Sequence, residues 1–341
     1  MSLLLFTSDR FAEHTPPPGH PERPERAEVF DAVAARWRQR GGAVAAPRPA
    51  RREELARVHE EGYLDAIART QGSAVALDPD TYTSPESHEI ALLGAGAAIE
   101  AARHALEGRG PAMAFVRPPG HHAERNRAMG FCLYNHAAAA AADALARGAS
   151  RVAVVDIDVH HGNGTQWIFY DEPRVLYLST HQYPYYPGTG AADEVGRGEG
   201  TGYTVNVPLE VGATDADYWR VYDGVIGPIV EQYAPDLVIV SAGFDAHERD
   251  PLAGMRVTTA GYAAIIARLH AAARRACGGR IAAVTEGGYH LEALAACLDA
   301  TLTELDAVAS PISFHPSGTS DRARAALGMV RAAQKAHWPA I

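Results

Sequence analysis

Short, almost wholly apolar segments recur along the chain, and Ala-rich segments of helical length separate them. The apolar runs span 3–6, 112–116, 152–157, 175–179, 204–207, 237–241 and 281–285. Strands buried on both faces of a parallel sheet have this continuous apolar character. We therefore predict an α/β fold with a mostly parallel central sheet. The helices expected on both of its faces span 27–40, 87–106, 136–147, 215–233, 259–276 and 291–300.

The lack of linker segments favours a single domain that spans residues 1–341. A length of 341 residues gives about two domains as a prior, but α/β folds reach about 250 residues or more as one unit. No Gly/Ser- or Pro-rich linker divides the chain, and no apolar run nears the length of a membrane span. The N-terminus also lacks the apolar core of a signal peptide.

Charge and cysteine content restrict the partners and the cellular compartment that the protein can have. Acidic residues number 41 against 31 basic ones, for a net charge of −10. A general nucleic-acid binder needs a basic face, so we expect no nucleic-acid partner, while a cationic substrate stays possible. The three scattered cysteines are Cys132, Cys277 and Cys297. They exclude a disulfide framework and suit a reducing compartment, so we expect a cytoplasmic protein without a membrane partner.

Four predicted strands are followed directly by side chains that can bind a metal or carry a proton. In chain order these side chains are His121 and His122, then Asp156, Asp158 and His160, then Asp245, and finally Tyr289. In open α/β sheets, ligands bind in the crevice at the carboxyl ends of the strands. The sequence therefore predicts one shared site at that edge of the sheet.

The segment from Asp156 to His160 predicts a metal site. Side chains alternate along a strand, so Asp156, Asp158 and His160 share a face. Burying two unpaired carboxylates is costly, and a divalent cation removes that cost. We expect Asp158, His160 and Asp245 to be the ligands, because three protein ligands with an open fourth position are typical of catalytic zinc. Oxygen and nitrogen ligands also suit Fe²⁺, and Asp156 is expected to orient a histidine through its ring N–H.

The adjacent histidines and the tyrosine predict acid–base and electrostatic roles. His121 and His122 are neighbours in sequence, so their side chains diverge and suit two separate proton carriers better than one chelate. One would take a proton from the attacking water, and the other would act electrostatically or protonate the leaving group. Tyr289 follows two glycines that permit a tight turn, and its phenol suits stabilisation of a developing oxyanion.

Seven motifs, in a fixed order, resemble those of the histone deacetylase family, which includes acetylpolyamine amidohydrolases and bacterial histone deacetylase-like amidohydrolases. They are HPERPER at 20–26, RPPGHHA at 117–123, GFCLYN at 130–135, DIDVHHGNGTQ at 156–166, YPGTG at 186–190, SAGFDAH at 241–247 and EGGY at 286–289. The motif-bearing region runs from about residue 14 to 300. The motif sequences HGNGTQ and EGGY are similar to those of the class II branch of this family.

The resemblance implies an arginase/deacetylase fold and a set of roles for the site residues. It implies one Zn²⁺ held by Asp158, His160 and Asp245. It also implies that His121 pairs with Asp156 and that His122 pairs with Asn163. The last position departs from the class I pattern, which has an aspartate there. A neutral amide stabilises an imidazolium less than a carboxylate does, so His122 should keep a lower pKa and serve more readily as the base.

The resemblance further implies a tunnel for an acylated lysine and a structural K⁺. The carbonyl of Gly130 would accept the substrate amide N–H, and Phe131 and Tyr186 would line the tunnel. The K⁺ would be bound by Asp156, Ser179 and the carbonyls of Asp158 and His160. Cys132 lacks the pattern of an activated nucleophile, and buried thiols are usually inert.

Four functions are weighed on these residues. The first is a zinc-dependent deacylase acting on acyl-lysine in proteins or peptides, and the second is a deacetylase of acetylpolyamines or other small amides. Leu252 follows Asp250-Pro251, where polyamine-selective members carry an acidic residue, so it favours the first function. A non-catalytic acyl-lysine binding module would lack His121, His122 or Tyr289. An arginase-like binuclear hydrolase would need further bridging Asp or His ligands.

Overall fold

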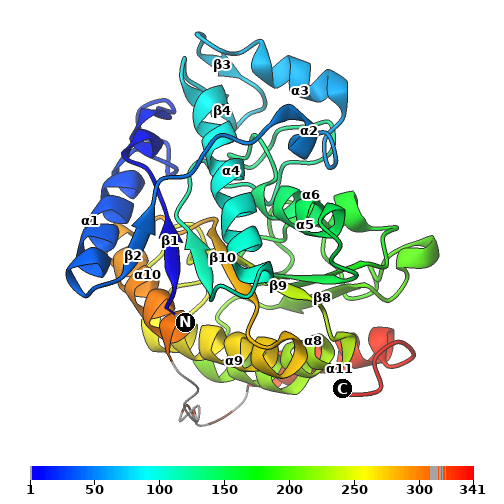
Figure 1. Ribbon diagram of the computed structural model, residues 1–341. Coiled ribbons are helices and arrows are strands. Elements are labelled where there is room, and N and C mark those ends of the chain that lie inside the picture. The colour runs from blue at the N-terminus through cyan, green and yellow to red at the C-terminus, as the bar shows by residue number, and fades with distance from the viewer. Residues whose placement is uncertain (1, 308–313, 315, 317, 319) are drawn as a thin grey trace.

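Eight parallel strands form the central sheet of the computed structural model, which describes residues 2–307, 314, 316, 318 and 320–341 (Figure 1). The strand order is β2-β1-β5-β10-β9-β6-β7-β8. The bounds are β1 Leu4–Phe6, β2 Ala43–Ala45, β5 Ala112–Ala114, β6 Val152–Asp156, β7 Val175–Gln182, β8 Thr204–Leu209, β9 Leu237–Ala242 and β10 Ile281–Thr285. The four strands predicted to carry the site are the four consecutive central strands of this sheet, β5, β10, β9 and β6. Their carboxyl ends therefore meet.

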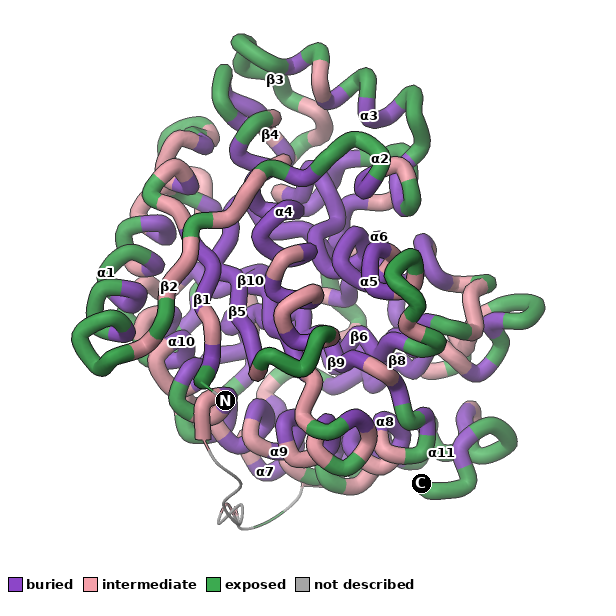
Figure 2. Tube along the Cα trace, in the orientation of Figure 1, coloured by how far each residue is buried: buried purple, intermediate pink, exposed green. Residues whose placement is uncertain are grey.

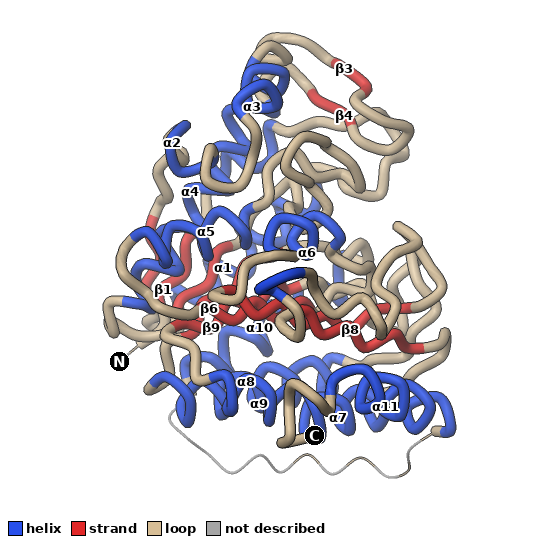
Figure 3. Tube along the Cα trace, turned by 90° about the vertical axis from the view of Figure 1, so that its right-hand side faces the viewer, coloured by secondary structure: helices blue, strands red, loops and turns tan. Residues whose placement is uncertain are grey.

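Helices cover both faces of the sheet, as predicted, and Figure 3 shows the strands edge-on between the two helical layers. One layer contains α4 (Ser87–Leu106), α5 (His136–Ala146) and α6 (Asn163–Phe169). The other contains α1 (Glu25–Gln39), α7 (Asp215–Val221), α8 (Gly227–Tyr233), α9 (Thr259–Cys277), α10 (Leu291–Asp306) and α11 (Asp321–Gln334). The short α2 (Arg52–Leu55) and α3 (Glu61–Ala68) lie beyond the first layer with the hairpin of β3 (Val75–Ala76) and β4 (Tyr82–Thr83) (Figure 1).

Burial on both faces explains the apolar strands. Every residue of β6, β9 and β10 is buried, and the buried strands form the middle of the molecule in Figure 2. The two layers enclose two hydrophobic clusters, one on each side of the sheet. Glycine lets α4 approach the segment between β2 and α2 closely. A Cβ on Gly96 of α4 would stand 1.8 Å from the carbonyl oxygen of Arg48, so only glycine fits there.

The single helix predicted over 215–233 is wrong. The structure has α7, then a π-helical turn at Tyr222–Ile226, then α8. Pro228 lacks the N–H that an α-helix would direct to the carbonyl four residues earlier, so the regular hydrogen-bond ladder breaks at this point. Gly227 also packs against a guanidinium, because a Cβ there would lie 2.2 Å from Cζ of Arg268.

Other differences are small and lie at element ends. The predicted strand at 112–116 ends at Ala114, while those at 175–179 and 204–207 continue to Gln182 and Leu209. The helix predicted at 291–300 extends to Asp306. We did not predict α11, the edge strand β2 or the β3–β4 hairpin. Within the described residues, no helix combines the length and hydropathy that crossing a bilayer requires.

Candidate active site

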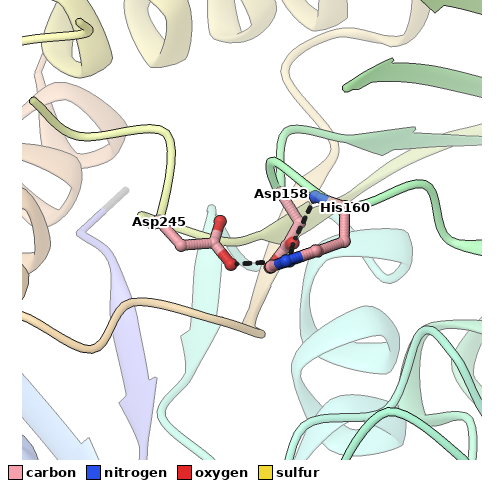
Figure 4. A group of neighbouring side chains, drawn as sticks. All are labelled: Asp158, His160 and Asp245. Carbon is pink, nitrogen blue, oxygen red and sulfur yellow. Dashed lines mark hydrogen bonds and ion pairs between the residues drawn. The ribbon is translucent and has the colours of Figure 1, made fainter. Parts of the chain in front are cut away.

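The three predicted metal ligands lie together at the carboxyl end of the sheet. Asp158 and His160 follow β6, and Asp245 follows the neighbouring β9. Their ligand atoms all lie within 4.8 Å of one another. Nδ1 of His160 is 3.1 Å from Oδ1 of Asp158 and 3.1 Å from Oδ2 of Asp245 (Figure 4). β6 ends at Asp156 rather than 157, but the expected alternation continues, since Ile157 and Val159 pack in the hydrophobic core.

Backbone groups hold these carboxylates in place. Asp158 accepts the N–H groups of His160 at 2.9 Å and Gly287 at 2.8 Å, and Asp245 accepts that of Val159 at 2.8 Å. At two positions the backbone lies so close to these carboxylates that a side chain would not fit. A Cβ on Gly243 would stand 2.0 Å from Oδ2 of Asp158, and one on Gly287 would stand 2.2 Å from Oδ2 of Asp245. The glycines of these loops therefore make space for the carboxylates.

The chemistry of this donor set fits a divalent cation. Burial and then the nearby Asp158 raise the pKa of Asp245 to about 7. Burial alone would lower the pKa of His160, but Asp158 and Asp245 outweigh it and raise the pKa to about 10. Two carboxylates therefore repel each other in a buried site with a single imidazole between them. A bound cation would balance both charges, and two oxygens with one nitrogen are ligands that zinc accepts.

His121 lies on the carboxylate side of the site. Its Nδ1 is 3.1 Å from Oδ2 of Asp156, which also accepts the hydroxyl of Tyr177 at 3.1 Å. Its Nε2 is 3.8 Å from Oδ1 of Asp158. Burial alone would lower the pKa of His121, but the charges of Asp158 and Asp156 outweigh it and raise the pKa well above its usual value. The structure thus places the predicted pair of His121 and Asp156 in contact.

His122 has a different partner and the opposite electrostatics. Its Nδ1 is 2.7 Å from Oδ1 of Asn163, as predicted for this pair. The ring centroids of His121 and His122 are 4.0 Å apart. Burial lowers the pKa of His122 well below its usual value, and the positive charges of His121 and His160 lower it further. Two adjacent histidines therefore have pKa values displaced in opposite directions, which suits distinct acid and base roles.

Tyr289 is buried, and contacts to its ring and backbone hold it in place. Its N–H donates to Oδ2 of Asp250 at 2.6 Å. The ring packs edge-on against Phe131 at 5.9 Å between centroids, and Cζ of Arg26 lies 5.1 Å from the ring centroid. Burial raises the pKa of the phenol well above its usual value, so the hydroxyl keeps its proton. That hydroxyl has no hydrogen-bond partner in the described part of the chain.

The predicted tunnel residues contact the histidines and Tyr289. The ring of Tyr186 is edge-on to His122 at 5.2 Å and to His160 at 6.1 Å between centroids, and Tyr186 is 37% exposed. Phe131 has φ of 69° and Gly130 has φ of 57°. A Cβ on Gly130 would stand 2.3 Å from the ring of His122, so glycine is required at that position. The carbonyl of Gly130, predicted to meet the substrate, contacts Sγ of Cys132 at 3.2 Å.

Leu252 meets the site through Tyr185, which sequence reasoning missed. The hydroxyl of Tyr185 donates to the carbonyl of Leu252, and its ring stacks on His160 at 5.6 Å and 22°. The four residues predicted to bind K⁺ are also adjacent. Ser179 pairs with Asp156 across β6 and β7, and Asp158 and His160 follow directly. The hydroxyl of Ser179 is 2.9 Å from Nδ1 of His181.

Two carboxylates that we did not single out contact His121 and the Asn163 partner of His122. Oε2 of the fully buried Glu286 accepts the N–H groups of Gly120 at 2.6 Å and His121 at 3.1 Å, and Oε1 accepts the hydroxyl of Ser241 at 2.9 Å. Glu124 accepts from the amide of Asn163. Glu124 directly follows the motif RPPGHHA, and Glu286 is the first residue of EGGY. These positions were the sequence signal that could have identified both residues.

Comparison with known proteins is consistent with this site. The model of the histone deacetylase domain matches residues 20–305. A probable deacetylase of Archaeoglobus fulgidus is 40% identical over 288 residues, covering 83% of this chain and 80% of its own length. The human polyamine deacetylase HDAC10 is 39% identical over 339 residues, and the alignment covers 94% of this chain and half of that protein.

The fold agrees with the same conclusion. The crystal structure of the HDA15 HD domain superposes with a TM-score of 0.92 at 38% identity, covering 100% of this chain and 98% of that domain. This confirms the predicted arginase/deacetylase architecture. The chain belongs to the histone deacetylase family, whose members are hydrolases acting on amides.

Proposed function

We propose that this chain is a zinc-dependent deacetylase that removes acetyl or other acyl groups from acyl-lysine in proteins or peptides. The observation that carries the proposal is the opposed pair of histidines. His121 on Asp156 and His122 on Asn163 stand beside a buried Asp-His-Asp cluster, and Tyr289 follows Gly287, whose N–H donates to Asp158 of that cluster. That set contains a base, an acid, a cation site and an oxyanion donor, which amide hydrolysis needs together.

Asp158, His160 and Asp245 would hold one Zn²⁺, or Fe²⁺ in its place. When bound, the ion would supply Lewis-acid polarisation of the scissile carbonyl. His122, with its depressed pKa, takes a proton from the attacking water. His121 is cationic beside Asp156 and Asp158, so it first stabilises negative charge and then gives its proton to the departing amine, which leaves it neutral. Tyr289 donates its hydroxyl proton in a hydrogen bond to the carbonyl oxygen as that oxygen gains charge.

Substrate orientation falls to the pocket rim in this proposal. Phe131 and Tyr186 would flank the aliphatic part of the acyl-lysine, and the carbonyl of Gly130 would accept its amide N–H. Leu252 presents an apolar side chain at the mouth. A structural K⁺ bound by Asp156, Ser179 and the carbonyls of Asp158 and His160 would brace the end of β6. The three free cysteines, all buried, suit a reducing cytoplasm.

A second candidate is hydrolysis of acetylpolyamines or another acetylated small amine. The similarity to human polyamine deacetylase over nearly the whole chain supports it. Asp80, which contacts Gly130 of the predicted tunnel, is the acidic residue that would hold a second ammonium. Its Oδ1 already accepts the N–H of Gly130 at 3.3 Å and the hydroxyl of Thr81 at 3.1 Å, and Leu252 is apolar. These two features favour acyl-lysine.

Steady-state kinetics on a matched pair of substrates test the choice. We expect kcat/KM for an acetyl-lysine peptide to exceed that for N-acetylputrescine, and the reverse order would favour the second candidate. Chelation should abolish turnover, and one equivalent of Zn²⁺ should restore it. Failure to hydrolyse either substrate with zinc bound would refute the proposal, and about two metal ions per chain would favour a binuclear hydrolase.

A further inference from the structure

The amide of Asn163 lies between two groups with different hydrogen-bonding abilities. On one side its Oδ1 is 2.7 Å from Nδ1 of His122. On the other its Nδ2 is 2.8 Å from Oε1 of Glu124 and 3.4 Å from Sδ of Met129. An ionised carboxylate only accepts hydrogen bonds, and a thioether is only a weak acceptor. Both neighbours therefore require the NH₂ of Asn163 to point toward them.

The orientation of this amide determines which nitrogen of His122 carries the proton. With NH₂ directed to Glu124, the carbonyl oxygen of Asn163 faces Nδ1 of His122, and Nδ1 must donate. Nε2 is then left with its lone pair, and no described residue hydrogen-bonds it. The ring carrying that lone pair is edge-on to Tyr186 at 5.2 Å and to His160 at 6.0 Å between centroids. This tautomer is the one that can accept a proton inside the pocket.

A flipped amide would reverse this arrangement. The NH₂ group would then donate to Nδ1 of His122, the proton would move to Nε2, and the histidine could no longer act as a base in the pocket. An aspartate at position 163 would accept from Nδ1–H in either orientation, because both of its oxygens are acceptors. An asparagine at this position needs a second residue to orient it.

We propose that Glu124 is a positioning residue that orients the Asn163 amide and thereby fixes the Nδ1–H tautomer of His122. Glu124 is itself well placed for this role. Its carbonyl meets the ring of His59 at 2.8 Å, its N–H donates to the carbonyl of Arg127 at 2.9 Å, and its carboxylate accepts from the guanidinium of Arg127 at 3.1 Å. Its catalytic consequence rests on the proposed function, in which His122 is the base.

A double-mutant cycle separates orientation of the amide from a general structural role. Glu124→Leu is made in the natural chain and in Asn163→Asp. A hydrogen bond to a charged acceptor gives a preference of roughly 10- to 100-fold between the two amide orientations. We expect kcat to fall about tenfold or more in the natural chain, with KM and zinc content unchanged. In the Asn163→Asp background, the same change should not lower kcat, because a carboxylate at position 163 needs no orienting group and loses a like charge that faces it. Equal losses in both backgrounds would overturn the proposal.

The tautomer itself is measured by ¹⁵N NMR of histidine-labelled, zinc-loaded protein, with His122→Ala used only to assign the signal. We expect a protonated Nδ1 and a bare Nε2 in the natural chain, and a second population with protonated Nε2 in Glu124→Leu. A protonated Nε2 in the natural chain, or an unchanged tautomer in Glu124→Leu, would overturn the proposal. This readout does not need turnover, so it tests the inference even if neither acetyl substrate is hydrolysed.

A control and a second variant complete the design. Arg127→Ala removes the ion pair of Glu124 but leaves its carboxylate facing Asn163, so kcat should stay within about twofold. If Glu124→Leu does not fold, Glu124→Ala enters the same cycle and the same NMR experiment. Thermal unfolding and metal analysis of each variant show that only folded, zinc-loaded protein is compared.

Discussion

Two groups of buried charged side chains meet on the loop that carries Tyr289, and they are balanced in opposite ways. The first, which we call the arginine cluster, consists of Glu22, Arg26 and Arg117. The carboxylate of Glu22 accepts from Arg117 at 2.7 and 2.9 Å and from Arg26 at 2.9 Å, and all three residues are 0% exposed. The three guanidinium nitrogens that do not bond Glu22 each donate to a backbone carbonyl, among them that of Gly288. Here the chain supplies both signs of charge.

The second group, the carboxylate cluster, consists of Asp158, His160 and Asp245. It contains two acidic groups and one imidazole, and it is joined to the same loop by the N–H of Gly287. The contrast appears in the pKa values of two equally buried carboxyls. Burial raises the pKa of Glu22, but Arg117 and Arg26 outweigh it and bring it to about 2. That of Asp245 rises to about 7. The carboxylate cluster therefore lacks the internal counter-charge of the arginine cluster, and a cation from outside the chain would supply it.

Removing a ligand should have the largest effect. We expect Asp245→Ala to lose both bound metal and all measurable turnover, because the remaining Asp158 and His160 cannot complete the site. The matched variant His122→Ala should lose turnover but keep its metal, since it removes a proton carrier and no ligand. Metal analysis and kinetics on both variants check this, and equal loss of metal would contradict the assignment of roles.

Breaking the arginine cluster should instead destabilise the fold. Glu22→Gln leaves two guanidinium groups buried without a counter-charge, which costs about 3–5 kcal/mol. The folded pKa of about 2 lies below the usual value of 4.5, so this stabilisation is present above pH 4.5 and is lost as the pH falls toward 2. Denaturant unfolding at several pH values measures it. A gap between variant and natural chain that did not narrow in acid would contradict the electrostatic cause.

Tyr289 lies between the two clusters, and Tyr289→Phe tests its role in turnover alone. Its hydroxyl has no hydrogen-bond partner in the described structure, so folding and metal content should hardly change. Loss of an oxyanion donor lowers kcat by roughly a hundred- to thousand-fold, about 2.7–4 kcal/mol. Affinity for substrate should change only modestly. Near-normal turnover of Tyr289→Phe on its best amide substrate would exclude the transition-state role.

The carboxylate cluster could be predicted from the sequence, and the arginine cluster could not. Asp158, His160 and Asp245 lie within four residues of strand ends, and the rule that parallel strands present their carboxyl ends at one edge brings them together. Glu22 and Arg117 are 95 residues apart, and Arg26 is 262 residues from Gly288. No local periodicity reports such pairs, because they arise only when α1 packs beside the sheet.

The same limit applies to the roles of individual side chains. The pairing of His122 with Asn163 followed from the family resemblance, and the structure confirms the contact at 2.7 Å. The orientation of that amide depends on Glu124, whose side chain reaches it from another loop. Similarly, the helix predicted over 215–233 is interrupted for two reasons. Pro228 lies within that segment, but the guanidinium of Arg268 on α9, which packs against Gly227, cannot be read from it.

The finest test of the comparison is Asp245→Asn in metal-free protein. Asparagine keeps an oxygen for the N–H of Val159 but removes one of two repelling charges. The folded pKa of Asp245, about 7, lies above its usual value of 3.8. Ionisation of this carboxyl therefore lowers the free energy of unfolding as the pH rises from about 4 through 7. At pH 8 the variant should therefore unfold at a higher denaturant concentration than the natural chain, with a free energy of unfolding larger by about 1 kcal/mol or more. This difference should close toward pH 4.

Added Zn²⁺ should reverse the order, because only the natural chain retains all three ligands. If Asp245→Asn instead destabilised the metal-free protein, as Glu22→Gln is expected to do, the chain itself would balance this carboxylate, and the distinction between the two clusters would fail.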